Sequence, residues 1–291
     1  MSDGEPHQIS LHIGLPARRE VVFSPSSGKR GTDGVTQATI VALYGDKPEP
    51  LRSFLAACQA EAAAVVGPRF RPYTFAQIHG TLIGLEREQS TGGPVNRNFL
   101  RLRQREIGMD FVGVLRLVRA AVPFQVRIGG FAEADEPFLS RGARPYARGF
   151  SVHGCDVVVM GWPVAPDGPA TLPAKASPDR VHYSTHLADM RRSAERCGVL
   201  HAHHGDPSRH DNDFYFRIGT LDGPLDDRLV SRTHGRLRGW LASRPPLFCT
   251  IALADLAVAF YRSPELPGES TLTFPLDAAA VDGAFIRDRL R

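Results

Sequence analysis

The chain has 291 residues, 42% of them hydrophobic, which is enough for one large domain or two smaller ones. Its formal net charge of +4 is well below the excess expected of a strongly nucleic-acid-binding surface, and no apolar run is long enough for a membrane helix. The N-terminus has no secretory signal pattern, and the four cysteines are widely separated without a CxxC pair. We therefore expect a cytoplasmic protein with neither a disulfide framework nor a structural zinc site.

Strand and helix patterns alternate after an N-terminal segment, residues 1–35, whose Gly, Ser, Pro and charged residues predict flexibility. Runs of β-branched and apolar residues predict strands, and Pro at a first turn or Gly after a last turn marks helices. In chain order we expect a strand over 36–44, a helix over 50–66, a strand over 75–86, a helix over 109–122, strands over 123–131 and 149–162, a helix over 184–197, a strand over 211–221, a helix over 226–243 and two strands within 247–263. Several strands are direct neighbours in sequence, which predicts an α+β fold over 36–291, with mixed or antiparallel sheets and helices on the outer faces.

One tripeptide on the strand predicted over 75–86 carries candidate chemistry. His79 and Thr81 are two residues apart, so their side chains point to the same face of the strand. An imidazole can give or take a proton near neutral pH, and a hydroxyl can donate a hydrogen bond to a phosphate oxygen. Burying such a pair without partners is costly, which favours a face that binds a ligand.

The sequence IHGTLIGLE around His79, which follows a strand and a helix, and the later VRIGGF resemble the two-histidine phosphoesterases, the LigT-like 2′–5′ RNA ligase family. The resemblance covers roughly residues 36–275 and implies a two-lobed fold whose sheets face a central cleft. It implies a phosphodiesterase that acts on 2′,3′-cyclic or 2′–5′ phosphodiesters of RNA ends or small nucleotides, without a metal or nucleotide cofactor. In that family two HxT or HxS motifs share the work, so His79 would be the general acid or base and Thr81 would bind the phosphate.

The second motif of that family is missing from the strand predicted over 211–221. Its alternate residues Asp211, Asp213, Tyr215 and Arg217 are expected on one face, which the resemblance turns toward His79. A carboxylate can replace histidine as a general base, but it repels a phosphate unless a cation offsets its charge. We therefore expect Asp213 to stand in for the second histidine and Arg217 to compensate its charge, with Tyr215 and Asp211 as further binding candidates.

Other histidines are alternatives for the missing one. His182 begins a literal HxS in HYS, although the serine lies where a helix cap is expected, and His153 lies on the strand over 149–162. The run HAHHGD lacks an acidic residue at the position that a metal motif would need, because Gly205 stands there. Its histidines, His201, His203, His204 and the nearby His210, are expected in an exposed loop.

Arginines are further candidates for phosphate contacts. Arg127 lies on the strand over 123–131, and Arg141 and Arg148 lie in a segment with Tyr146, a combination that suits a phosphate with a stacked base. A second arginine-rich segment, 96–106, is expected to be extended.

Three interpretations remain open at this point. The chain is a phosphodiesterase, a diverged module that binds a nucleotide or RNA end without turnover, or a metal-dependent hydrolase that uses Asp211, Asp213 and nearby histidines. None of them requires an obligate protein partner.

Overall fold

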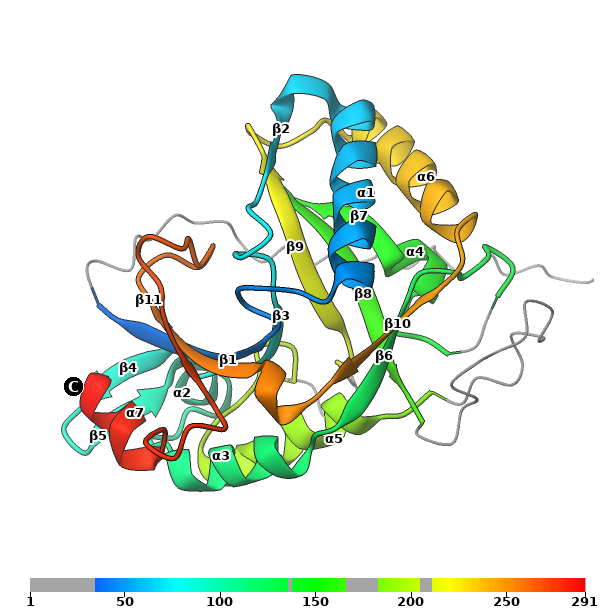
Figure 1. The fold of residues 1–291 in the computed structure, drawn as a ribbon. Coiled ribbons are helices and arrows are strands. Elements are labelled where there is room, and N and C mark those ends of the chain that lie inside the picture. The colour runs from blue at the N-terminus through cyan, green and yellow to red at the C-terminus, as the bar shows by residue number, and fades with distance from the viewer. Residues whose placement is uncertain (1–34, 136–137, 166–182, 205–210, 291) are drawn as a thin grey trace, which may run out of the picture.

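A large antiparallel sheet organises the molecule. The structure is a computed structural model that describes residues 35–135, 138–165, 183–204 and 211–290 (Figure 1). A 10-stranded sheet runs in the order β10-β6-β8-β9-β3-β1-β11-β12, with β2 beside β9 and β7 beside β8. All of these strand pairs are antiparallel. The α+β class and the antiparallel sheet predicted from the sequence are therefore confirmed, whereas the segment up to residue 34 lies outside the described residues.

The sheet has two halves that meet where β3 pairs with β9. One half contains β3 (Gly80–Gly84), β1 (Gln37–Ala42), β11 (Leu256–Tyr261) and β12 (Leu272–Pro275). The other half contains β9 (Phe214–Leu221), β8 (Asp156–Val164), β6 (Phe124–Ile128), β10 (Leu247–Ile251), β2 (Phe70–Pro72) and β7 (Phe150–His153). A separate two-stranded sheet pairs β4 (Arg87–Ser90) with β5 (Gly93–Asn96).

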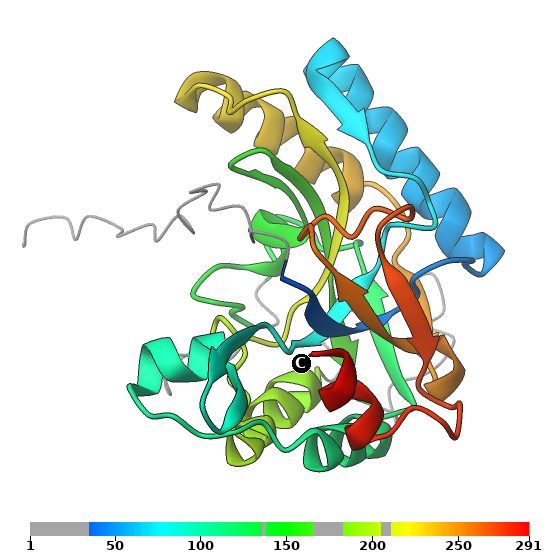
Figure 2. The same ribbon diagram turned by 90° about the vertical axis from the view of Figure 1, so that its left-hand side faces the viewer.

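Helices flank the two halves in separate groups, as Figures 1 and 2 show. α1 (Glu49–Val66) and α6 (Asp227–Ala242) pack against each other and against strands of the β9 half. α3 (Phe111–Ala120) packs against α5 (His186–Ser193) and α7 (Gly283–Arg289), and α5 also contacts β3. The shorter helices are α2 (Arg97–Arg103), α4 (Pro145–Gly149), η1 (Gly67–Arg69), η3 (Ala194–Cys197) and η4 (Leu253–Asp255).

Helix ends follow from local sequence. Asp110 caps α3 by accepting a hydrogen bond from the Gly113 amide, and Asp226 caps α6 in the same way from the Leu229 amide. α1 ends at Gly67, whose φ of 71° lies in the left-handed region that glycine adopts without strain. The apolar face of α1 buries side chains at helical spacing, namely Leu51, Leu55, Cys58 and Ala62.

The two faces of the sheet differ in character. The main hydrophobic core, with Leu82, Phe214 and Phe216, lies on the face that the helices cover. The opposite face carries two small separate clusters, one around Val41 and one around Trp162. We call this opposite face the His79 face.

Four predicted elements differ in the structure. The strand expected over 149–162 is a hairpin of β7 and β8, because Gly154, with φ of 62°, allows a tight turn there. The segment 96–106 is not extended: it forms α2, which Asn96 caps by accepting a hydrogen bond from the Phe99 amide. The strands expected over 75–86 and 211–221 are shorter, beginning at Gly80 and Phe214.

Candidate functional site

The pairing of β3 with β9 places the candidate motif. Gly80 pairs with Phe216 in an antiparallel register, and both positions face the core. A β-carbon on Gly80 would overlap the ring of Phe214, so glycine is needed for the two strands to approach. Side chains on either side of a pair point to the other face, so His79 and Thr81 share the His79 face with their β9 neighbours.

The same register identifies those neighbours. In an antiparallel ladder one strand runs down as the other runs up, so His79 lies opposite Arg217 and Thr81 lies opposite Tyr215. Each strand thus has one residue before and one residue after the Gly80–Phe216 pair on this face. In chain order, Tyr215 on β9 corresponds to His79 on β3, and Arg217 corresponds to Thr81. The sequence prediction that Tyr215 and Arg217 face His79 agrees with this register.

His79 is held by its own backbone. Its Nδ1 lies 2.7 Å from the Gln77 carbonyl oxygen, and its ring centroid lies 5.8 Å from that of Tyr44. A carbonyl can only accept, so Nδ1 carries the proton and Nε2 keeps its lone pair. This tautomer leaves Nε2 ready to accept a proton from a substrate or water.

Burial lowers the pKa of His79 to about 4, and the cations Arg217 and Lys47 add to this effect, while the Gln77 carbonyl opposes it. The imidazole is therefore neutral at physiological pH. A bound phosphate would offset the positive charge nearby and raise the pKa of His79, which would make it a better base in the complex than in the free protein.

Arg217 supplies the positive charge beside His79. Its guanidinium lies 3.1 Å from the Asp156 carboxylate, and the two side chains are 25% and 30% exposed, so solvent and ligands can reach this pair. Burial raises the pKa of Tyr215 to about 12 and also raises that of Tyr73, while Arg217 lowers both in part. The neutral hydroxyls of Tyr73 and Tyr215 and the charged guanidinium of Arg217 therefore lie together opposite His79.

Loops from distant parts of the sequence complete this region, and sequence analysis missed their residues. Gln77 donates to the Glu265 carbonyl oxygen at 2.8 Å, and Tyr44 donates to the Leu266 carbonyl oxygen at 3.0 Å. The loop between β11 and β12 therefore lies beside the segment that leads into β3 (Figure 2). No spacing rule links such loop residues to a strand motif, so only the hydrogen bonds in the structure identify them.

Asp213 lies at the other end of this face. It precedes Arg217, the residue opposite His79, by four positions. At about 3.3 Å per residue, this separates the two residues by roughly 13 Å along the strand direction. Its carboxylate accepts hydrogen bonds from Trp162 Nε1, at 2.7 Å, and from Ser140, and lies 2.6 Å from Arg148. The Asp213 and Arg148 side chains are only 4% and 10% exposed, so these candidates compensate each other's charge.

Asp211 lies at the same end of the His79 face as Asp213. Its carboxylate lies 3.1 Å from His201 Nε2 and 3.8 Å from the buried Arg191 guanidinium. Arg191 donates to the carbonyl oxygens of four residues on the two central strands and their approaches, namely Thr81, Leu82, Asp211 and Asp213. Arg191 therefore links β3 to the start of β9 where the two strands no longer pair.

The remaining candidates lie away from His79. Arg127 is buried and donates to the Gly129 and Gly130 carbonyls and to Tyr183, two strands from β9 in the sheet order. Arg141 is exposed, and His153 lies on β7, where its Nε2 is 2.9 Å from Ser151 Oγ. His182 and His210 lie outside the described residues.

Comparison with known proteins does not assign a family. No family model matches the sequence, and no curated protein matches it. Among solved structures, the chain is similar to TT0787 of Thermus thermophilus, at 14% identity over 83% of this chain and 95% of that chain, with a TM-score of 0.36. It is also similar to ATU0111 from Agrobacterium tumefaciens str. C58, described as a conserved protein of unknown function, at 15% identity over 74% of this chain and 80% of that chain, with a TM-score of 0.33.

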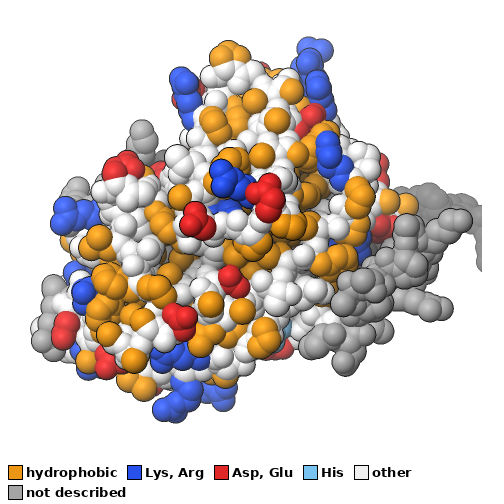
Figure 3. Space-filling model, in the orientation of Figure 1, with side chains coloured by type: hydrophobic (Ala, Val, Ile, Leu, Met, Phe, Trp, Pro, Cys, Tyr) orange, Lys and Arg blue, Asp and Glu red, His pale blue; other side chains and the backbone are white. Residues whose placement is uncertain are grey.

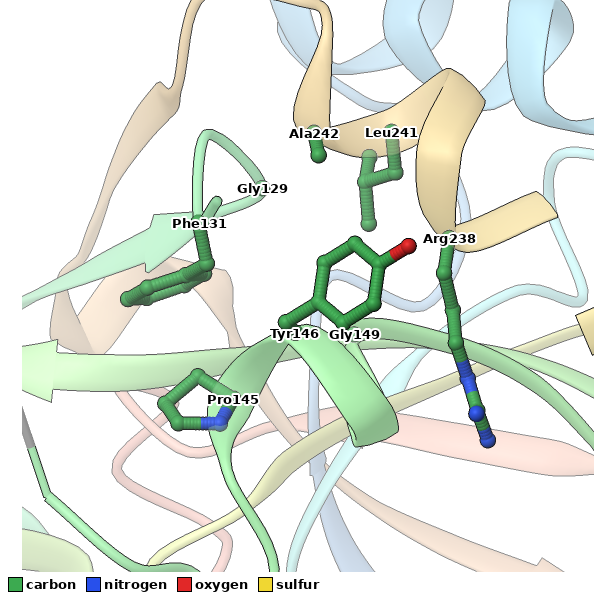
Figure 4. Close-up of a pocket in the computed structure, with 8 residues that line it drawn as sticks. All are labelled: Gly129, Phe131, Pro145, Tyr146, Gly149, Arg238, Leu241 and Ala242. Carbon is green, nitrogen blue, oxygen red and sulfur yellow. The ribbon is translucent and has the colours of Figure 1, made fainter. Parts of the chain in front are cut away.

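Two other features of the part of the chain that the structure describes concern metal binding and a hollow away from His79. There, no group of three or more His, Cys, Asp or Glu side chains is arranged to hold a metal ion. A small hollow lies between α4 and α6, lined by Gly129, Phe131, Pro145, Tyr146, Gly149, Arg238, Leu241 and Ala242 (Figure 4). Its lining is mostly apolar and does not include His79.

One face of the molecule can be described by its charge. On the face shown in Figure 3, Lys and Arg side chains are scattered and alternate with Asp and Glu. Among the helices of the described residues, none combines the length and apolar character that a membrane span requires.

Proposed function

We propose that the chain is a metal-independent phosphodiesterase, similar in design to the LigT-like two-histidine phosphoesterases, and that His79 is its general base. The observation that carries the proposal is the register of β3 and β9, which puts neutral His79 and Thr81 opposite Arg217 and Tyr215. The substrate class is a 2′,3′-cyclic or 2′–5′ phosphodiester of a nucleotide or an RNA end, a class that rests on the resemblance of the His79 motif.

Each side chain has a task in this proposal. His79 Nε2 removes the proton from the attacking water or hydroxyl, since its other nitrogen already donates to Gln77. Arg217 contacts the phosphate oxygens, where its charge stabilises the anionic transition state. The Thr81 hydroxyl donates a hydrogen bond to the same phosphate.

The test is hydrolysis of a panel of 2′,3′-cyclic nucleotides and short 2′–5′ and 3′–5′ oligonucleotides, with and without EDTA. We expect turnover that EDTA does not reduce and that falls about 100-fold or more in His79→Ala, the usual contribution of a general base. A suitable control is His186→Ala, because His186 contacts the Ala121 carbonyl away from this site. Full activity of His79→Ala would refute the assignment of His79.

A second function is favoured by one specific observation: Tyr215-Phe216-Arg217 stands where a second histidine motif would lie. A module that binds the phosphate of a nucleotide or RNA end without cleaving it needs Arg217 and Thr81 but no second proton-transfer group. It predicts calorimetric binding of 2′-AMP or 3′-AMP by a protein that turns over no member of the panel. Turnover that depends on His79 would exclude this alternative.

A further inference from the structure

The loop after β1 brings a lysine to the His79 site. The Lys47 ammonium donates to the Leu43 carbonyl oxygen at 2.9 Å and to the Gly45 carbonyl oxygen at 3.0 Å. These carbonyls flank Tyr44, whose ring lies against the His79 ring. The Gly45 amide also donates to the Ala76 carbonyl oxygen at 2.8 Å, so the loop is hydrogen-bonded to the segment that carries His79.

The backbone of this loop is shaped to hold the ammonium. Leu43 has a φ of 62° and Gly45 a φ of 88°, so both lie in the left-handed region. For a leucine this conformation is uncommon and costs on the order of 1 kcal/mol, which the surrounding contacts must offset. Two of the three N–H donors of Lys47 are used by the carbonyls, and the third has no acceptor among the described residues.

The residue type is also informative. The chain has 35 Lys and Arg in total, and only Lys29, Lys47 and Lys175 are lysine. A lysine can lose its proton at moderately alkaline pH, whereas an arginine cannot. Burial lowers the pKa of Lys47 to about 8, partly opposed by the neighbouring Asp46, and Lys47 in turn lowers the pKa of His79.

We propose that Lys47 contacts the phosphate ester bound at His79 and protonates the leaving oxygen, the task that falls to the second histidine in a two-histidine site. The proposal rests on the proposed phosphodiesterase function. His79 Nε2 takes a proton from water, and the water oxygen forms a bond to phosphorus. The bond from phosphorus to the ester oxygen breaks, and that oxygen takes a proton from the Lys47 ammonium. His79 and Lys47 then return to their starting states by proton exchange with solvent.

The kinetic test compares Lys47→Arg with Lys47→Met on 2′,3′-cyclic AMP. Lys47→Arg keeps the charge but cannot release a proton, so we expect kcat to fall about 100-fold while the Kd for 2′-AMP stays within about threefold. Lys47→Met should lose both turnover and affinity. The wild-type rate should decline above about pH 8, and Lys47→Arg should lack this decline. The titratable groups that interact with the ammonium in this comparison are Asp46 on its own loop and His79, whose pKa Arg217 also lowers. A Lys47→Arg protein with wild-type kcat and pH profile would overturn the proposal.

A direct test avoids variants at Lys47 altogether. With three lysines in the chain, ¹⁵N-lysine NMR of the wild-type protein gives few signals, which Lys29→Arg and Lys175→Arg assign by loss. We expect the Lys47 signal to shift on addition of 2′-AMP, and an unchanged Lys47 signal at saturating 2′-AMP would overturn the contact. The two proposals fail separately: turnover lost in His79→Ala but unaffected in Lys47→Arg removes only the role of Lys47. No turnover by the wild-type protein on the whole panel removes the proposed activity and the acid role together.

Discussion

Each end of the His79 face holds an Arg–Asp ion pair, and the two pairs differ in their exposure to solvent. At the His79 end, Arg217 and Asp156 form a pair whose side chains are 25% and 30% exposed, beside a neutral imidazole with a free nitrogen. At the other end, Asp213 and Arg148 form a pair that is 4% and 10% exposed and is also hydrogen-bonded to Trp162 and Ser140. Removing one partner of a buried ion pair destabilises a fold, whereas a charge that a ligand can reach is available for binding. We therefore infer that chemistry lies at the His79 end and structural support at the Asp213 end.

The largest effect, a loss of stability, is expected at the Asp213 end of the His79 face. Arg191→Met removes a buried guanidinium that donates to carbonyls of both central strands and leaves Asp211 with its main cation missing. Loss of one partner of a buried ion pair costs about 3–5 kcal/mol, so urea unfolding should show a decrease of that size. Arg192→Met is the matched control, because Arg192 is 47% exposed beside Asp189, and it should cost under about 1 kcal/mol. Equal stability losses in the two variants would contradict the interpretation that the Asp213 end supports the fold.

A smaller effect, on activity alone, is expected at the accessible end. Arg217→Gln should lower kcat/KM about 10- to 100-fold, because a charged hydrogen bond to the substrate contributes about 1.5–3 kcal/mol. Steady-state kinetics on 2′,3′-cyclic AMP measures this loss. The control is Arg71→Gln on neighbouring β2, whose ion pair with Asp222 is largely exposed and should leave kcat/KM unchanged. If both substitutions have the same effect, Arg217 acts only through general charge.

The smallest effect is a change in the pH dependence of stability. The pKa of His79 is about 4 in the folded protein, below its ordinary value of 6.5, so the unfolded chain binds more protons between these values. Stability therefore rises with pH across this window and is lost as pH falls through it. In His79→Gln this contribution disappears, and urea unfolding at about pH 5 and pH 7 should differ less than in the wild-type protein. An unchanged difference would mean that His79 is not buried as a neutral group.

Much of the fold follows from the sequence, because its signals are local. Pro50 at the first turn and Gly67 after the last turn predicted the helix that the structure has as α1, whereas the caps that Asp110 and Asp226 form on α3 and α6 are seen only in the structure. The turn at Gly154 was missed, since one glycine between apolar runs does not distinguish a hairpin from a continuous strand. Asn96 was equally ambiguous, so a helix was predicted as an extended segment.

The site was predictable only in part. Alternation along one strand placed Tyr215 and Arg217 on one face, but the register with His79 depends on the pairing of two strands far apart in sequence. Period-two alternation cannot separate Asp213 from Arg217, although they lie at opposite ends of the His79 face. Tyr44 reaches the His79 ring through a left-handed loop turn whose carbonyls also hold Lys47, and the sequence contains no recognisable motif for this turn.

His79 is assigned to chemistry and Asp213 to support of the fold, and this division of roles can be measured directly. The test determines both turnover of 2′,3′-cyclic AMP and the free energy of unfolding for His79→Ala and Asp213→Asn side by side. We predict that His79→Ala loses turnover about 100-fold or more and keeps its stability at pH 7, whereas Asp213→Asn loses stability and its folded fraction retains turnover. A stable, inactive Asp213→Asn protein together with an active His79→Ala protein would contradict this division.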